Sequence, residues 1–155
     1  MGGVLVATHG FGTGPLPPRA DRLVVEKSNR QLTIYRGQQP VKSYRIALGR
    51  NPVGPKRVLG DGRTPEGRYA IDYRNERSAF YRALHISYPS RNDIEKARLL
   101  GASPGGAIMI HGLPNGVAAV GEGEDWTEGC IAVSNEAMDE LWTLVADGTV
   151  IEIHP

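Results

Sequence analysis

The chain has 155 residues, of which 40% are hydrophobic and 23% are charged, and its formal net charge is +1. This size and composition predict a single globular domain built around one apolar core. A net charge so close to zero does not supply the basic surface that nucleic-acid binding needs, so no nucleic-acid partner is expected. No segment approaches the roughly 20 consecutive apolar residues of a membrane helix.

The first residues contain the run Gly-Thr-Gly-Pro-Leu-Pro-Pro, which favours a flexible lead-in over residues 1–20. We therefore expect the folded domain to span residues 21–155. The apolar stretch from Met1 to Ala7 is short and lacks a charged flank, so a signal segment is not clearly present. The single cysteine cannot form an intramolecular disulfide, and any chemical role it has would be that of a thiol or thiolate.

Short segments with β-branched or alternating apolar residues predict strands along most of the chain. In chain order these segments are 23–27, 31–35, 42–48, 69–73, 84–88, 107–110, 130–133 and 149–153. The first two are separated by Ser28-Asn29-Arg30, which predicts a hairpin. Residues 49–67 hold five glycines and three prolines and therefore predict a long loop.

Two helices are expected among these strands. Ser90, with Asp93 three residues later, forms a capping-box pattern that predicts a helix over residues 91–100. A second helix follows Ser134 or Asn135 as its N-cap. Its apolar positions have the i, i+3, i+4, i+7 spacing of one helix face: Met138, Leu141, Trp142 and Val145. Because strands and helices do not alternate, we expect a mainly β fold, a mostly antiparallel sandwich or barrel with two helices packed outside.

Cys130 and His111 are the candidates for catalytic chemistry. A nucleophilic cysteine needs a nearby base, backbone donors for an oxyanion and an open approach for the carbonyl group. His111 lies at the end of an apolar segment, directly before Gly112, and a backbone carbonyl could fix its tautomer. Gly129 would let substrate approach closely, and the amides of Gly129 and Cys130 are candidate oxyanion donors. Since no helix begins at Cys130, its thiolate would be stabilised mainly by imidazolium.

Each of these features also has an ordinary structural explanation. A free cysteine can be buried and inert, and a histidine on a strand can be part of the framework. The acidic side chains of the loop before Cys130 can be solvated; if they lie near the site, they would oppose a thiolate and favour a protonated His111. These side chains are Glu122, Glu124, Asp125 and Glu128. The histidines and Cys130 lack close ligand spacing, so no metal site is expected.

Three runs taken together are more specific than their parts: Thr64-Pro65-Glu66-Gly67-Arg68-Tyr69, Ile110-His111-Gly112 and Thr127-Glu128-Gly129-Cys130-Ile131. In order and spacing they resemble the YkuD-type L,D-transpeptidase catalytic domains, and the sequence around Cys130 resembles the ErfK/YafK-like branch. The 18 residues from 112 to 129 that separate the histidine from the cysteine suit that family. The resemblance covers about residues 22–154.

The resemblance implies a β-rich domain in the periplasm or cell envelope that acts on peptidoglycan stem peptides. Cys130 would attack the carbonyl of the third stem-peptide residue and expel the fourth, with His111 as the base, Gly129 in the oxyanion hole and Gly112 bordering the site. The thioester would pass to an amine on another stem peptide or on a wall-attached lipoprotein. The resemblance implies no metal or organic cofactor.

This chain departs from the common family pattern at two positions. Glu128 stands where a histidine is usual, and Ala132 stands where an arginine or asparagine is usual. The second change removes a cation that could help to bind an anionic substrate or an oxyanion. Neither residue is the proposed nucleophile or base, so the changes bear on the choice of donor and acceptor.

Three functional hypotheses remain open from the sequence. The first is a cysteine L,D-transpeptidase that joins the acyl group to an amine. The second is an L,D-carboxypeptidase or amidase that uses the same Cys130 and His111 but passes the thioester to water. The third is a non-catalytic β-sandwich that binds peptidoglycan and keeps Cys130 buried; a content of only 6% aromatic residues argues mildly against it.

Overall fold

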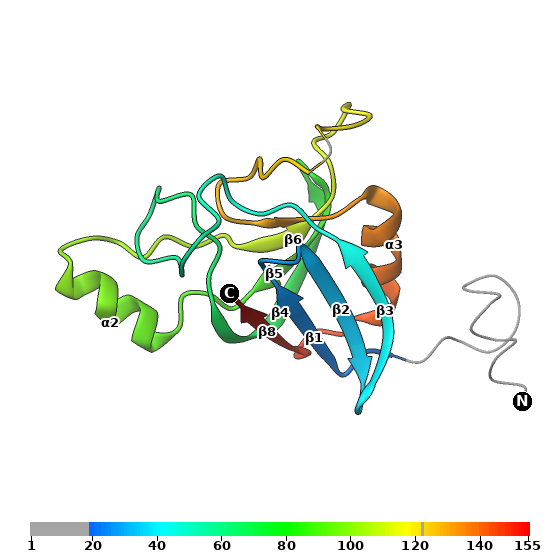
Figure 1. Ribbon diagram of the computed structural model, residues 1–155, viewed down its shortest axis with the longest axis horizontal. Helices are drawn as coiled ribbons and strands as arrows, with labels where there is room; N and C mark the ends of the chain where they lie inside the picture. Colours follow the sequence, from blue (N-terminus) through cyan, green and yellow to red (C-terminus); the bar gives the residue numbers. More distant parts are fainter. Residues whose placement is uncertain (1–18, 122) are drawn as a thin grey trace, which may run out of the picture.

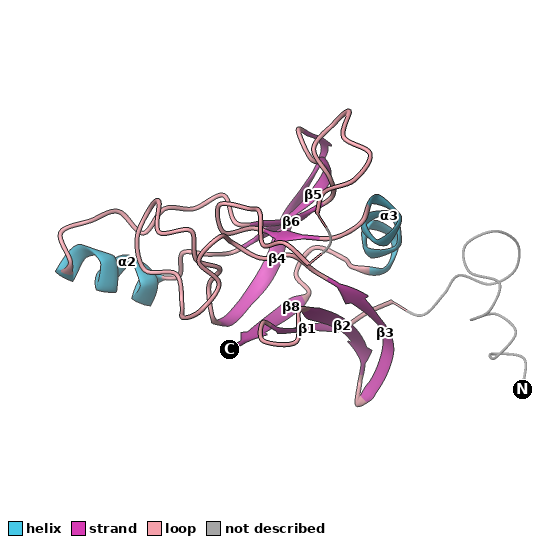
Figure 2. Cartoon of the chain, turned by 45° about the horizontal axis from the view of Figure 1, so that its top comes forward, coloured by secondary structure: helices cyan, strands magenta, loops and turns pink. Residues whose placement is uncertain are grey.

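The computed structural model describes residues 19–121 and 123–155. Within these ranges the chain forms an eight-stranded sheet and two helices (Figures 1 and 2). The strands are β1 (Arg22–Glu26), β2 (Gln31–Arg36), β3 (Gln39–Arg45), β4 (Gly67–Ser78), β5 (Tyr81–Ile86), β6 (Met109–His111), β7 (Ile131–Ala132) and β8 (Val150–His154). The expected mainly β fold is confirmed.

The order of strands in the sheet is β3-β2-β1-β8-β4-β5-β6-β7. Strands β1 and β2 pair in antiparallel fashion and form the hairpin predicted from the sequence. Strand β8 runs parallel to β1 and antiparallel to β4, and so it joins the two halves of the sheet. Strands β6 and β7 are also parallel, while the other pairs are antiparallel. The prediction of mostly antiparallel pairing therefore holds, with two parallel exceptions.

The two ends of the sheet approach each other beyond β3 and β7. Ala47 forms an isolated antiparallel bridge with Ala132, and Gly49 forms an isolated parallel bridge with Thr127. These bridges close the sheet into a barrel-like shape, which agrees with the expected sandwich or barrel. They also bring the loop that follows β3 against the segment that contains Cys130, which positions the candidate site.

The helix α3 (Asn135–Leu144) covers one face of the sheet. Its N-cap is Ser134, whose hydroxyl accepts a hydrogen bond from the amide of Ala137. Met138 and Leu141 are fully buried, as the predicted stripe requires, and the helix packs beside β5 and β6. The burial of this apolar face is the main reason that the helix is stable.

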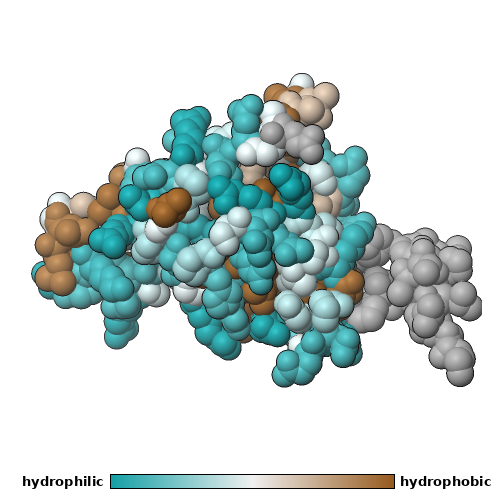
Figure 3. Space-filling view, in the orientation of Figure 1, coloured by the Kyte–Doolittle hydropathy of each residue, from teal (hydrophilic) through white to brown (hydrophobic). Residues whose placement is uncertain are grey.

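The helix α2 (Arg91–Leu99) projects from the other end of the molecule (Figure 1). Ser90 and Asp93 form the predicted capping box, because each side chain bonds the backbone amide of the other residue. Only Ala97 of this helix is buried. Leu99 and Leu100 are 74% and 61% exposed, and apolar surface gathers at this end of the molecule in Figure 3.

The core lies between the sheet and α3 and is composed of aliphatic side chains from nearly every strand. Its fully buried members include Leu23, Leu32, Ile34, Ile71, Leu84, Ile110, Ile131 and Ile151. Ala20 is buried, and its amide donates to the carbonyl of Leu144. Most of the predicted lead-in, residues 1–18, lies outside the described residues. No helix in the described ranges is long and apolar enough to span a membrane.

Candidate active site

The candidate nucleophile and base lie on neighbouring strands. Ile110 pairs with Ile131 and His111 pairs with Ala132 across the parallel β6–β7 ladder, and Cys130 directly precedes β7. Since side chains alternate along a strand, positions 109, 111, 130 and 132 all project from one face of the sheet. Cys130 and His111 therefore open into the same pocket, which has a volume of about 300 Å³. Its remaining lining residues are Arg50, Phe80, Trp126, Thr127 and Glu128.

The His111 ring is held in one orientation by its neighbours. Its Nδ1 lies 2.8 Å from the carbonyl oxygen of Gly112, so Nδ1 carries the proton and donates, which leaves Nε2 as an acceptor. The ring of Phe80 stacks on the imidazole at a centroid distance of 4.5 Å, and Trp126 lies 5.6 Å away on a tilted plane. These contacts leave the histidine 4% exposed. The expected role of a backbone carbonyl in fixing the tautomer agrees with this arrangement.

Burial sets the resting protonation of both groups. It lowers the pKa of His111, although the hydrogen bond to the Gly112 carbonyl acts in the opposite direction. Burial also raises the pKa of the Cys130 thiol, against the smaller effects of the Met109 amide and the charge of Lys56. At neutral pH both directions favour a neutral imidazole beside a protonated thiol. The expected thiolate stabilised by imidazolium is therefore not the resting arrangement that these pKa directions favour.

The Cys130 sulfur forms hydrogen bonds with the backbone at the start of β6 and just before it. It accepts a hydrogen bond from the amide of Met109 at 3.4 Å, and the thiol donates to the carbonyl of Ala107 at 3.3 Å. The residue is only partly buried. The sulfur is thus positioned at the pocket wall, where a thiolate would keep one backbone amide as a hydrogen-bond donor.

Gly129 is required by its conformation and by a close contact. Its φ of +137° is disfavoured for other residues, and a Cβ atom there would lie 2.7 Å from the carbonyl oxygen of Arg63. The Gly129 amide donates to Thr127 Oγ1, and that hydroxyl in turn donates to the Cys130 carbonyl at 2.7 Å. Of the two expected oxyanion donors, the Gly129 amide is therefore already engaged. The Cys130 amide makes no hydrogen bond to another residue in the described part of the chain.

Gly112 connects the base to the rest of the site. Its amide donates to the carbonyl of Phe80 at 2.9 Å, which positions the phenyl ring against the imidazole of His111. A Cβ atom at Gly112 would lie 2.3 Å from Asn135 Oδ1, so a larger residue would displace this side chain, which accepts a hydrogen bond from the Leu113 amide. Gly112 therefore borders the site as expected, and its carbonyl is the acceptor for the histidine.

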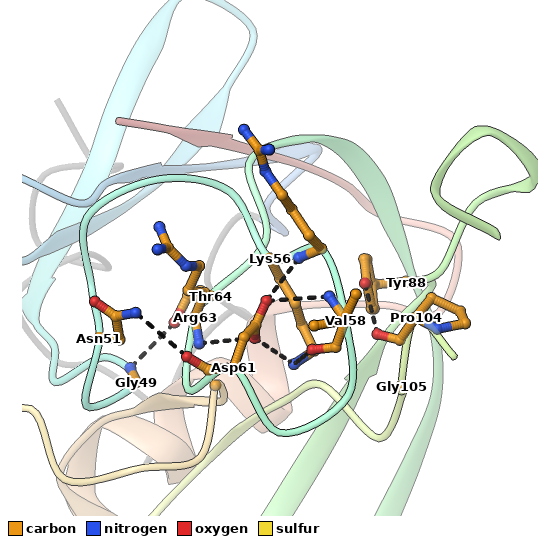
Figure 4. Close-up of polar contacts among 12 residues, drawn as sticks. Gly49, Asn51, Lys56, Val58, Asp61, Arg63, Thr64, Tyr88, Pro104 and Gly105 are labelled. Atoms are coloured by element: carbon orange, nitrogen blue, oxygen red, sulfur yellow. Dashed lines mark hydrogen bonds and ion pairs between the residues drawn. The ribbon is translucent and has the colours of Figure 1, made fainter. Parts of the chain in front are cut away.

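The long loop after β3 forms one wall of the site and is tightly organised (Figure 4). The Asp61 carboxylate accepts hydrogen bonds from the Lys56 ammonium and from the amides of Arg57, Val58 and Arg63. Burial acts to raise the pKa of Asp61, but these donors together hold it below its usual value. The sequence predicted this loop from its glycines and prolines without indicating that it has a buried ionic centre.

Lys27 and Thr64 attach the same loop to the sheet. The buried ammonium of Lys27 donates to the carbonyls of Gly54 and Thr64 and to Glu66 Oε2. The hydroxyl of Thr64, which is fully buried, accepts from the amide of Gly49 at 3.1 Å. The loop therefore provides a fixed backbone beside Gly129 and Cys130.

Of the acidic loop residues considered from the sequence, Glu128 lines the pocket and Asp125 does not. Glu128 forms an ion pair with Arg50, with 2.7 Å between Arg50 Nη1 and Glu128 Oε2. Asp125 is instead paired with Arg30 at 2.7 Å. Glu122 lies outside the described residues. In the described part of the chain, no cluster of three or more His, Cys, Asp or Glu side chains could hold a metal ion.

Phe80, Trp126 and Arg50 complete the pocket but were not identified from the sequence. Phe80 is the second residue of the two-residue turn between β4 and β5, and Trp126 and Arg50 lie in loops. None of these positions has a periodic pattern that would indicate which way its side chain points. The one sequence feature that could have indicated Trp126 is its place in the Asp-Trp-Thr run, four residues before Cys130.

Comparison with solved structures identifies the fold. The "helical cell shape determining protein Pgp2" from Campylobacter jejuni matches with a TM-score of 0.69 and 23% identity, over 88% of this chain and 48% of that chain. An L,D-transpeptidase from Xylanimonas cellulosilytica matches with a TM-score of 0.56 and 16% identity, over 95% of this chain and 66% of the other. The fold is therefore that of the L,D-transpeptidase catalytic domains.

The sequence comparison agrees with the fold and extends it. The family model "YkuD: L,D-transpeptidase catalytic domain" matches residues 20–153. The Escherichia coli protein named "Putative L,D-transpeptidase YafK" is 30% identical over 131 residues, which are 80% of this chain and 46% of that protein. The chain belongs to the YkuD family, as the sequence motifs indicated, and it spans about half the length of the curated relatives that it matches.

Proposed function

We propose that this chain is a peptidoglycan L,D-transpeptidase-type cysteine acyltransferase that cleaves stem-peptide amide bonds through a thioester. Membership of the YkuD family supports the reaction class. The observation that carries the proposal is the shared pocket of Cys130 and His111, in which the Gly112 carbonyl leaves Nε2 free to accept a proton. The proposed place of action is the cell envelope, where peptidoglycan is found.

The first half of the reaction forms the thioester. The Cys130 sulfur attacks the carbonyl carbon of the third stem-peptide residue while its proton passes to His111 Nε2. The Cys130 amide, which has no other acceptor in the described part of the chain, donates to the oxyanion. When the tetrahedral intermediate collapses, the carbon–nitrogen bond breaks and the amine of the fourth residue leaves with the proton from Nε2.

The second half of the reaction regenerates the enzyme. An amine of another stem peptide, or of a wall-attached lipoprotein, attacks the thioester carbonyl and gives a proton to His111. The carbon–sulfur bond then breaks, a new amide forms, and the proton returns to the thiolate. If water replaces the amine, the same steps give a carboxylate, which is the carboxypeptidase or amidase alternative. Both outcomes use the same two residues.

An intact-mass experiment tests the proposed nucleophile. The wild-type protein should gain the mass of one carbapenem, because the thiol opens the β-lactam ring, and Cys130→Ala should gain none. The same substitution should lower release of the fourth residue from a disaccharide tetrapeptide by at least about a thousandfold. An adduct that persists in Cys130→Ala, or a wild-type protein that binds peptidoglycan without forming any adduct, would contradict the enzymatic proposal and favour the binding-module alternative.

The products separate the two enzymatic alternatives. Cross-linked dimers from purified muropeptides would identify an amine as the acceptor, whereas shortened monomers alone would identify water.

A further inference from the structure

Two oppositely charged side chains, Arg50 and Glu128, line the pocket that contains Cys130 and His111. Arg50 and Glu128 form an ion pair with 2.7 Å between Nη1 and Oε2, and their side chains are 67% and 75% exposed. Both line the pocket together with Cys130 and His111. Since burial favours the neutral form of His111, Arg50 is the cation that lines this pocket among the described residues.

The backbone of Arg50 is fixed to the segment that contains the thiol. Its amide donates to the carbonyl of Thr127 at 3.0 Å, and the amide of Thr127 donates to the carbonyl of Leu48 at 3.2 Å. The preceding residue, Gly49, donates to Thr64 Oγ1, as Figure 4 shows. The arginine therefore has an exposed guanidinium on a backbone that is hydrogen-bonded to the segment containing Cys130.

Other cations close to the site are already engaged. The ammonium of Lys56 is buried and bound to Asp61, and the guanidinium of Arg63 donates to the carbonyl of Val53. Ala132 removes the cation that is usual two residues after the thiol. Arg50 lies directly after Gly49, which forms the bridge with Thr127, and its side chain lines the pocket. It is thus the group that can supply positive charge to a bound substrate.

We propose that Arg50 binds the terminal carboxylate of the donor peptide, in exchange with Glu128. A guanidinium has five N–H donors in a planar fork that matches a carboxylate, and Nη1 is the nitrogen in contact with Glu128. A solvent-exposed ion pair is weak, so a substrate carboxylate can replace Glu128 at little cost. This inference rests on the proposed function and names the part of the substrate that this site recognises.

The chemistry of the donor makes this contact geometrically reasonable. In the proposed reaction the fourth residue leaves, and its free carboxylate is separated from the scissile carbonyl by one residue, about 3.5 Å of extended chain. The rest of the pocket near the thiol is largely aromatic, with Phe80 and Trp126, and Arg50 is the charged donor among its lining residues. When no substrate is bound, the ion pair with Glu128 holds the Arg50 guanidinium beside the pocket. Glu128 therefore competes with the substrate carboxylate for Arg50.

Two matched donors test the role of Arg50: a disaccharide tetrapeptide with a free terminal carboxylate and the same molecule with a terminal carboxamide. The readout is release of the fourth residue, with KM and kcat measured separately. For the carboxylate donor, Arg50→Ala should raise KM about three- to fivefold, because an exposed charge-assisted contact is lost. For the carboxamide donor the same substitution should change KM less than about twofold.

Three further variants sharpen the test. Glu128→Gln removes the competing carboxylate, so KM for the carboxylate donor should fall, whereas Arg50→Lys keeps the charge and should restore part of the affinity. Arg68→Ala is the matched control, because Arg68 is paired with Glu152 on another face of the sheet and should leave both KM values unchanged. Thermal unfolding of each variant shows whether it is folded.

Two results would overturn the inference and can be told apart. An equal rise in KM for both donors in Arg50→Ala, or a rise in KM for the carboxylate donor in Glu128→Gln, would exclude carboxylate recognition while leaving the proposed function intact. Failure of the wild-type protein to release the fourth residue from either donor would overturn the proposed function itself.

Discussion

Burial has opposite effects on the two reactive side chains. It lowers the pKa of the imidazole of His111 and raises that of the Cys130 thiol, so both shifts favour the neutral form of the group. In the proposed reaction the thiol would lose its proton as it attacks, and the proton would pass to a base that already has the required tautomer. A protonated thiol would react slowly with oxidants and alkylating reagents, since the thiolate is the reactive form.

The pH dependence of alkylation tests this view of Cys130. The thiolate reacts with iodoacetamide, and a raised pKa means that the thiolate fraction grows only at a higher pH than in an ordinary cysteine. The alkylation rate should therefore be slow at neutral pH and should rise through an apparent pKa higher than that of an ordinary cysteine. The measurement is the rate of mass increase from pH 5 to 10, with a cysteine-containing peptide as the control. A rate that is already constant at pH 6 would indicate a resting thiolate–imidazolium pair.

The reactive residues themselves could be predicted from the sequence, whereas their surroundings could not. Cys130 is the only sulfur nucleophile in the chain, and its spacing from His111-Gly112 is a local property that can be read directly. Phe80 and Arg50 reach the pocket because of how distant segments pair, through the Gly112–Phe80 and Arg50–Thr127 backbone hydrogen bonds. A single sequence does not specify such long-range pairs.

At the scale of an element, the loop between β3 and β4 behaves as part of the framework. Its glycines and prolines indicate a loop, yet Asp61 and Lys56 are buried and organise it from within. The Lys56 ammonium side chain is 3% exposed and that of Asp61 is 12% exposed. The loop holds both Arg50 and the Arg63 carbonyl that contacts Gly129, so its rigidity determines the geometry of the site.

Asp61→Asn should destabilise the protein by about 2–3 kcal/mol, because it leaves the buried ammonium of Lys56 without its counter-charge. The folded-state pKa of Asp61 is lowered, so its contribution is present above the unfolded-state pKa and is lost as pH falls through the folded-state value. The difference in stability between wild type and variant should therefore shrink below about pH 4. Urea unfolding at several pH values measures it.

The control for Asp61 is an ion pair of similar composition at the surface. Glu95→Gln breaks the exposed contact with Arg98 and should leave the urea midpoint unchanged. Equal effects of the two substitutions would show that burial of the Asp61 pair does not matter.

The expected elements themselves were found with small differences in their ends. The predicted strand over residues 42–48 is observed as β3, which ends at Arg45, and its remainder continues as the isolated bridge of Ala47. The segment 130–133 is reduced to the two residues of β7. In both cases the apolar pattern continues past the ladder because the side chains remain buried after regular pairing ends. Burial and strand pairing are separate properties, and the pattern reports burial.

At the scale of the whole molecule, the sheet depends on one strand. β8 lies between β1 and β4 and is the strand that joins β1–β3 to β4–β7 in the sheet order. Ile151 pairs with both Leu23 and Tyr69 and is fully buried. The parallel pairing of β8 with β1 could not be read from the sequence, because an apolar segment of five residues does not indicate its neighbours or their direction.

Ile151→Ala should lower the free energy of unfolding by about 2–5 kcal/mol, since it creates a cavity where the two halves of the sheet meet. Ile94→Ala is the matched control, because Ile94 is 49% exposed on α2 and loses far less buried surface. Chemical unfolding followed by fluorescence compares the two. Similar losses for both isoleucines would show that β8 is not the central structural link.

The position of β8 also has a consequence for the way in which the protein is made. Strand β8 is needed to place β1 next to β4, so the complete strand order cannot form until residues 150–154 have been made. Contacts between the beginning and the end of a chain form slowly. For a protein that is proposed to work outside the cytoplasm, this delay would keep the polypeptide in a form that can be threaded through an export channel before it folds.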